Sequence, residues 1–177
     1  MNKKKLIVCL SLIVVVILGL FIIFKVFKKS DEHYIKNSDN LYDIAIDYLI
    51  KNNNDSTKNK SHYKLFIFPK KFAITEDKEN KYAYMHICVQ SYYVKDNKII
   101  SYLGSSMLYK FTFDKKTNKV IEYENPVDGY ENNASIRRMF PDDIEDEAIK
   151  FKFDDKELIK EVKEYYSFLE DTNIYYK

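Results

Sequence analysis

The chain has 177 residues, with 29 Lys or Arg against 27 Asp or Glu, and a formal net charge of +2. Residues 1–30 contain six lysines and no acidic residue, which leaves 23 basic and 27 acidic residues, a net charge of −4, for residues 31–177. A mildly acidic domain with scattered charge is a poor ligand for a phosphate backbone, so nucleic acid is excluded as the expected partner. About 147 residues are enough for one core and predict one domain.

The first element in chain order is an uncharged run of nineteen residues, Leu6–Phe24. A helix of that length spans about 30 Å, the thickness of the hydrocarbon core of a bilayer. Lysines lie directly before and after the run. The sequence therefore predicts a short tail over 1–5, a single transmembrane helix over 6–27 and a linker over 28–38, with the lipid bilayer as the first partner.

An uncleaved signal anchor is favoured over a cleaved signal peptide, because the apolar run is long and no small-residue cleavage site follows it. Cys9 lies at the start of the run, where a lipoprotein cysteine is not expected. Three lysines lie on each side, so the positive-inside rule does not decide the orientation. We expect the short tail inside and the domain outside the cell. A cytoplasmic domain is the alternative.

The predicted domain, 39–177, begins with a helix. Apolar residues recur with helical spacing from Leu41 to Leu49, and Ser38 or Asp39 can cap the N-terminus. The polar stretch 51–62 ends the helix and reads as an exposed loop.

Antiparallel strands are predicted next. Residues 63–74 contain Pro69, which predicts an edge strand or two short strands. The side chains of residues 82–94 are predicted to alternate between the two faces of a strand. One face carries Ala83, Met85, Ile87 and Val89, and the other carries Tyr84, His86, Cys88 and Gln90. Turns at 95–98 and 115–118 lead into strands at 99–113 and 120–123.

The C-terminal part is predicted to be helical. A short helix over 135–140 is stopped by Pro141, and a second short helix lies within 142–149. Asp154 or Asp155 caps the last helix. On that helix Leu158, Val162, Tyr165, Tyr166 and Leu169 share one face.

A helix followed by a meander predicts an α+β fold of cystatin-like (nuclear-transport-factor-like) type. We expect the first helix on the concave face of the sheet and the C-terminal helices over an edge or an end. The segments Pro126-Val127-Asp128-Gly129 and 136–141 (IRRMFP) resemble a segment of membrane-tethered extracytoplasmic domains of Gram-positive bacterial proteins. The resemblance implies a location and a fold, and no activity. The bias toward Lys, Asn, Ile and Tyr is typical of AT-rich genomes.

Tyrosine is enriched, with sixteen residues and no tryptophan. A pocket for a peptide or glycan at the mouth of the sheet is one interpretation, and ordinary strand propensity is the other. The two arginines suit carboxylate or phosphate partners, or a surface ion pair. The candidate ligand-binding residues are Tyr82, Tyr84, Tyr92, Tyr102, Arg137 and Arg138.

Catalytic and cofactor motifs are missing from the sequence. The three histidines do not cluster with other metal ligands, and the three glycines form no phosphate loop. Cys88 is the only cysteine after residue 30, so the domain has no internal disulfide, and a His86–Cys88 pair is read as structural. The acidic run 142–147 lacks the spacing of a calcium loop. We expect no catalytic residues, no metal site and no cofactor.

Three functions remain open at this point. The first is a membrane-anchored, non-enzymatic binding or assembly module at the cell envelope, with an envelope protein or a peptide as partner. The second is a single-pass subunit of secretion or conjugation machinery, which rests on fold analogy. The third is a small enzyme with its site in the cavity of the sheet, where His86, Glu122 and Asp128 would be the candidates. The oligomeric state is not predicted.

Overall fold

A computed structural model describes residues 33–34, 40–53 and 63–176, all within one unit that spans residues 33–177. The predicted tail, the transmembrane helix 6–27 and the capping residues Ser38 and Asp39 lie outside the described residues. Part of the predicted linker is a short strand. The elements are β1 His33–Tyr34, α2 Asn40–Asn53, β2 Lys64–Glu76, β3 Asn80–Lys95, β4 Lys98–Asp114, β5 Val120–Glu124, the 3₁₀ turn η1 Gly129–Glu131, α3 Asn132–Met139, α4 Glu145–Lys150, α5 Lys156–Tyr165 and β6 Ile174–Tyr175.

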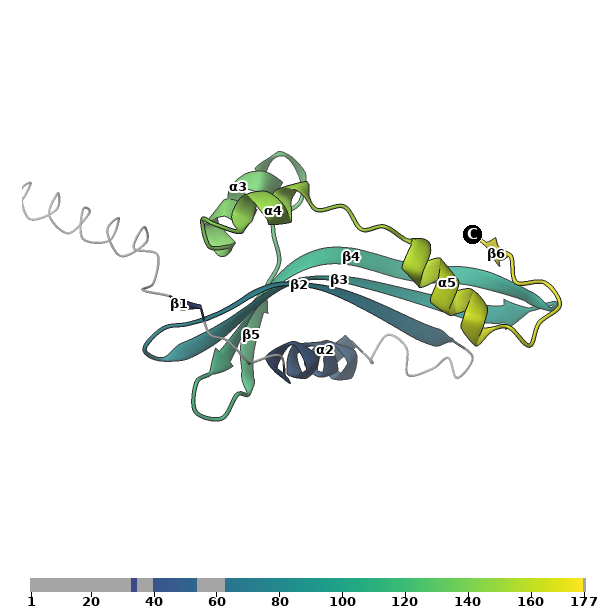
Figure 1. Cartoon of the computed structure of the whole chain (residues 1–177), viewed down its shortest axis with the longest axis horizontal. Helices are drawn as coiled ribbons and strands as arrows, with labels where there is room; N and C mark the ends of the chain where they lie inside the picture. Colours follow the sequence, from purple (N-terminus) through teal and green to yellow (C-terminus); the bar gives the residue numbers. More distant parts are fainter. Residues whose placement is uncertain (1–32, 35–39, 54–62, 177) are drawn as a thin grey trace, which may run out of the picture. The chain divides into compact units, whose positions relative to one another are not determined.

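The strands form one sheet in the order β1-β2-β3-β4-β5, and every neighbouring pair in this path is antiparallel (Figure 1). β6 pairs with β4 in parallel. The α+β class with an antiparallel meander is therefore confirmed. The hairpin between β3 and β4 turns at Asp96 and Asn97, whose φ values of 50° and 61° match the two left-handed positions of a type I′ turn.

β2 is one continuous edge strand rather than two short ones. β1 pairs only with Thr75 and Glu76, so most of the outer edge of β2 has no strand partner in the described part of the chain. Pro69 lies on this stretch, opposite Ile87 of β3, and it is exposed. A proline is tolerated there because its missing N–H is not needed on an open edge.

α2 packs on one face of the sheet (Figure 1). Leu41, Ala45 and Leu49 of the helix are buried against alternate residues of the long strands. The sequence predicts the helix and the division of β3 into two faces, and both are confirmed. The structure shows that the face of Ala83 is the one that α2 covers. The buried strand residues in this core are Ile74, Ala83, Met85, Ile87, Tyr109, Phe111 and Phe113.

The C-terminal helices cover the opposite face of the sheet, not an edge or an end as expected. α3 and α4 pack on Tyr82 and Tyr84, and α5 packs on Phe66, Cys88 and Tyr92, in two separate clusters (Figure 1). The reason is that β3 is apolar on both faces, so both faces need a cover.

α5 differs from its prediction in two details. Leu158, Val162 and Tyr166 are buried, whereas Tyr165 is half exposed and packs its ring on Phe66 at the rim of the same face, with ring centroids 5.7 Å apart. Asp155 stands at the N-cap without a side-chain hydrogen bond, whereas Asp154 Oδ1 accepts a hydrogen bond of 3.1 Å from the Lys156 amide.

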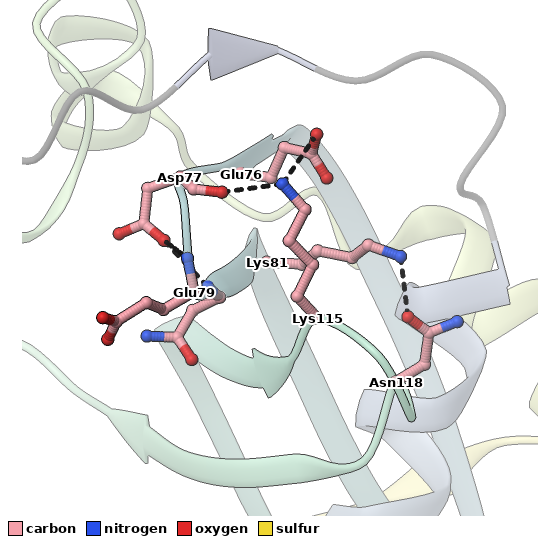
Figure 2. Close-up of polar contacts among 7 residues, drawn as sticks. Glu76, Asp77, Glu79, Lys81, Lys115 and Asn118 are labelled. Atoms are coloured by element: carbon pink, nitrogen blue, oxygen red, sulfur yellow. Dashed lines mark hydrogen bonds and ion pairs between the residues drawn. The ribbon is translucent and has the colours of Figure 1, made fainter.

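Two polar turns are joined at one end of the sheet (Figure 2). Asp77 Oδ1 accepts hydrogen bonds from the amides of Glu79 and Asn80, at 2.9 and 2.8 Å. Lys115, from the turn after β4, donates to the Asp77 carbonyl at 2.8 Å and lies 3.1 Å from the Glu76 carboxylate. These contacts fix the β2–β3 turn against the β4–β5 turn.

Candidate functional site: the exposed centre of strand β4

A β-bulge interrupts the pairing of β3 with β4. Gln90 pairs with Gly104 and Tyr92 with Ser101, so two β4 residues, Tyr102 and Leu103, lie opposite the single residue Ser91. The extra residue reverses the side-chain alternation along β4. As a result Ile99 packs under α5, whereas Tyr109, also at an odd position, packs under α2.

Five consecutive residues, Leu103–Met107, are exposed in the middle of the strand, beginning at the second residue of the bulge. We call this segment the open stretch of β4. Alternate residues of a strand face opposite sides of a sheet, so exposure of all five means that both faces are uncovered here. The Leu103 side chain is 60% exposed, and the Met107 side chain is also exposed. Gly104 has no space for a larger side chain, because the Gln90 amide occupies the place of a Cβ.

On the α2 side, the open stretch borders a groove of about 500 Å³, the α2-side groove. Its lining is mostly apolar and comes from α2 and from strands β2 to β5. Apolar lining with a few polar groups is typical of sites that bind apolar ligands or side chains. Six of the lining residues are Ile46, Leu49, Ile67, Val89, Leu103 and Met107.

A cluster of three tyrosines includes two lining residues of this groove. The rings of Tyr63 and Tyr102 have centroids 4.5 Å apart, and Tyr93 lies 5.1 Å from Tyr63 and 6.2 Å from Tyr102. The sequence singled out Tyr102 but not Tyr63 or Tyr93. The pairing of Tyr93 with Ile100 and the bulge bring these rings together, and neither is visible as a spacing in the sequence.

The structure does not place Tyr82, Tyr84 and Tyr92 with Tyr102. All three are buried on the opposite face, under the C-terminal helices. Burial raises the pKa of Tyr92 to about 12, with smaller contributions from Tyr176, Cys88 and Asp155. The physical reason for the separation is the bulge, which turns Tyr102 to the α2 side although it has the same parity as the other three.

The two arginines lie on α3 and have different environments. Arg137 forms a fork with Glu145 and Asp146 of α4, the second at 2.8 Å. Those hydrogen bonds raise the pKa of the guanidinium. Arg138 is exposed and forms no ion pair with a residue that the structure describes. Arg137 thus fits the surface-pair interpretation.

On the other side of the open stretch lies a second pocket of about 360 Å³, the His86 pocket. His86 is 7% exposed, its Nε2 is 2.8 Å from Ser106 Oγ, and its ring packs against Phe151 and Phe153. Its Nδ1 is buried with no hydrogen-bond partner among the described residues. Burial lowers the pKa of the imidazole, which keeps the ring neutral at pH 7.

The third hypothesis required His86, Glu122 and Asp128 to lie together. His86 and Asp128 line the same pocket, but Glu122 is an exposed residue of β5 outside it. Burial, with a smaller contribution from Asp155, raises the pKa of the Cys88 thiol, which disfavours the nucleophilic thiolate. Ser106 and His86 are in contact, yet within the described ranges no side chain orients Nδ1, as a hydrolytic triad requires.

Within the described ranges, no group of three or more His, Cys, Asp or Glu side chains could hold a metal ion. None of the helices described is long and apolar enough to cross a membrane.

Comparisons with protein-family models, curated proteins and solved structures gave no match for this chain. The function is therefore argued from the residues and the geometry alone.

Proposed function

We propose that this chain is a membrane-anchored, non-enzymatic binding module of the cell envelope. In this proposal the apolar run Leu6–Phe24 is a single-pass signal anchor, and the domain lies outside the cell. The helix laid across one face of an antiparallel meander supports a cystatin-like domain as part of the proposal. Its partner is an envelope protein or a peptide, consistent with the mildly acidic domain.

The observation that carries the binding role is the open stretch of β4 beside the α2-side groove. A strand of a sheet normally buries at least one of its faces, and here five successive residues bury neither. The exposed Leu103 side chain and the apolar groove beside it form one contiguous apolar surface, and such surfaces mark interaction sites. Binding rather than catalysis fits this surface, since its lining is mostly apolar.

Protease treatment of intact protoplasts that carry the full chain with a C-terminal tag tests the location. Loss of the tag is expected, with a cytoplasmic control protein protected and an external one cut. Survival of the tag under the same conditions would place the domain inside and would remove the envelope from the proposal.

Site-specific photo-crosslinking in membranes of the native cells tests the binding role. A photoreactive amino acid at Leu103 is expected to give one discrete covalent adduct with a protein or peptide. Tyr130, which is 95% exposed in the 3₁₀ turn η1, is the matched control position and is expected to give no discrete adduct. Equal labelling at both positions, or no adduct at Leu103, would contradict the proposal.

A further inference from the structure

The outer edge of β4 is occupied at both ends but not in the middle. β5 pairs with β4 over 110–113, and β6 pairs with it at Ile99 and Ile100. Between them, no strand of the described part of the chain pairs with this edge over 103–108. Asn125 Nδ2 donates a hydrogen bond of 2.8 Å to the Leu108 carbonyl, which marks one end of the gap.

The direction of the backbone groups in this gap follows from three hydrogen bonds. The Leu108 carbonyl bonds Asn125 and so points away from β3, whereas the amide and carbonyl of Leu103 bond Ser91 of β3. In an antiparallel ladder both groups of one residue point to the same edge, and the edge alternates along the strand. The amides and carbonyls of Gly104 and Ser106 therefore point outward, and those of Ser105 and Met107 point toward β3.

This edge lacks the features that protect open edges. The segment 101–109, SYLGSSMLY, contains no charged residue and no proline. The open edge of β2, at the other side of the sheet, contains Pro69 and the exposed lysines Lys64, Lys70 and Lys71. Prolines and lysines are the usual devices against strand addition. The open edge of β2 is thus protected against strand addition, whereas the open edge of β4 carries no such protection.

Resting on the proposed function, we propose that a short extended segment of the partner adds to β4 as a new strand, with main-chain hydrogen bonds to Gly104 and Ser106. Its alternate side chains then meet two different surfaces. Those on one face lie beside the apolar α2-side groove, next to Leu103 and Met107. Those on the other face lie beside the polar His86 pocket, next to Ser106. The segment recognised is one with apolar residues at alternate positions and small polar residues between them.

A second copy of the chain does not fit this gap through its own β4. A symmetric β4–β4 pair would run antiparallel and would extend past both ends of the gap. Strand β4 is 17 residues long, so its continuation would occupy the positions held by β6 and β5. The gap between Ile100 and Lys110 is nine residues long, roughly 30 Å, and accepts only a short segment.

Selective labelling of glycine makes the contact directly observable, because the chain has three glycines: Gly19, Gly104 and Gly129. The probe is the capped peptide Thr-Leu-Thr-Leu-Thr-Leu-Thr, added to the full chain in lipid nanodiscs. We expect the Gly104 amide to shift and become protected from hydrogen exchange, while Gly129 stays unchanged. A peptide of the same composition with its leucines consecutive is the control and is expected to bind at least tenfold more weakly. An unchanged Gly104 amide at saturating probe would overturn the proposal.

Methylation of the peptide's backbone amides separates strand addition from side-chain binding. Only one of the two alternate sets of amides faces β4. Methylation of that set is expected to raise Kd about tenfold or more, and methylation of the other set to change Kd less than about twofold. Equal effects of the two sets would rule out strand addition.

A pair of variants tests the protein's side. Ser106→Pro and Ser106→Ala both remove the hydroxyl that contacts His86, but only Ser106→Pro removes the outward amide. Ser106→Pro is expected to abolish protection of Gly104 by the probe, and Ser106→Ala to keep it. Equal protection in the two variants would contradict the proposal. If Ser106→Pro fails to fold, the methylated peptides decide the same question on the unaltered protein.

The two proposals fail in different ways. If Leu103 crosslinks a partner equally well in the Ser106→Pro and Ser106→Ala chains, the binding role stands and strand addition is wrong. If Leu103 gives no adduct in the unaltered chain, the proposed function itself is wrong. If the Gly104 amide is protected without probe and in proportion to protein concentration, a second copy is the occupant and the proposal is overturned.

Discussion

Ser91 and Leu103 hold the β-bulge of β4 through one hydroxyl. Ser91 Oγ donates to the Leu103 carbonyl at 2.9 Å and accepts from the Leu103 amide at 3.1 Å. One side chain thereby satisfies both backbone groups that the extra residue displaces from the ladder. The same bulge turns Tyr102 and Leu103 toward the α2 side, so the shape of the groove depends on this serine.

Ser91→Ala is expected to destabilise the fold by about 1–3 kcal/mol, because it leaves a backbone amide and carbonyl without their partner. Ser105→Ala, an exposed serine of the same region, is the control and is expected to change stability by less than about 0.5 kcal/mol. Urea unfolding of the full chain measures both. Equal stabilities of the two variants would show that the Ser91 hydroxyl does not support the bulge.

Gly104→Ala is expected to act through Gln90. The new Cβ displaces the Gln90 amide, which then loses its 2.8 Å hydrogen bond to Ser101 Oγ. A loss of about 1 kcal/mol is expected, since the displaced group is the end of a flexible side chain. In a Gln90→Ala background the same substitution is expected to cost little. A double-mutant cycle measures the coupling, and additive effects would contradict the mechanism.

His86 makes stability depend on pH in the mildly acid range. Burial lowers the pKa of the folded imidazole below its usual value of 6.5. The unfolded chain therefore binds a proton first as the pH falls, so this contribution to stability is present above pH 6.5 and is lost as the pH falls through the folded pKa. Denaturant midpoints from pH 8 to pH 5 are expected to fall more steeply for the unaltered chain than for His86→Gln. Parallel profiles would exclude His86 as the cause.

Asp77 is expected to contribute at lower pH. Burial raises the pKa of its carboxyl, but hydrogen bonds from the Asn80 and Glu79 amides and from Tyr82, with the charge of Lys115, leave it below the usual 3.8. Its contribution is present above about pH 3.8 and is lost as the pH falls through the folded pKa. Asp77→Ala is expected to destabilise the fold by about 1–2 kcal/mol at pH 7. The loss should shrink as the pH falls below 3.8, and a loss that keeps its full size in acid would show that the carboxylate charge is not its source.

Patterns of short range determined most of the elements. The helical spacing from Leu41 to Leu49 predicts α2, and the alternation around Ala83 predicts which residues of β3 share a face. The type I′ turn at Asp96 and Asn97 follows from residues that accept positive φ. Each of these depends on neighbours in the chain, so the sequence is enough to specify them.

The candidate site was less predictable. One interpretation of the sequence places Tyr82, Tyr84, Tyr92 and Tyr102 together at the mouth of the sheet. The bulge turns Tyr102 to the face opposite the other three, and it depends on a hydrogen bond between residues 12 apart in the chain. Ser91 has no local signature of that role. The sequence likewise leaves two interpretations of Arg137, a residue that binds a carboxylate or phosphate partner or a member of a surface ion pair. The position of α4 beside α3 favours the ion pair.

By itself, the sequence determined the class of the fold, the order of its main helices and long strands, and the apolar run that predicts the anchor, since periodicity and charge are local properties. Tertiary structure alone decided where the sheet stays uncovered. The C-terminal helices pack as two separate clusters on the face opposite α2, and β5 and β6 pair with the two ends of β4. These long-range contacts cover the rest of the sheet and leave the centre of β4 exposed. The sequence of residues 103–107 alone does not predict that exposure.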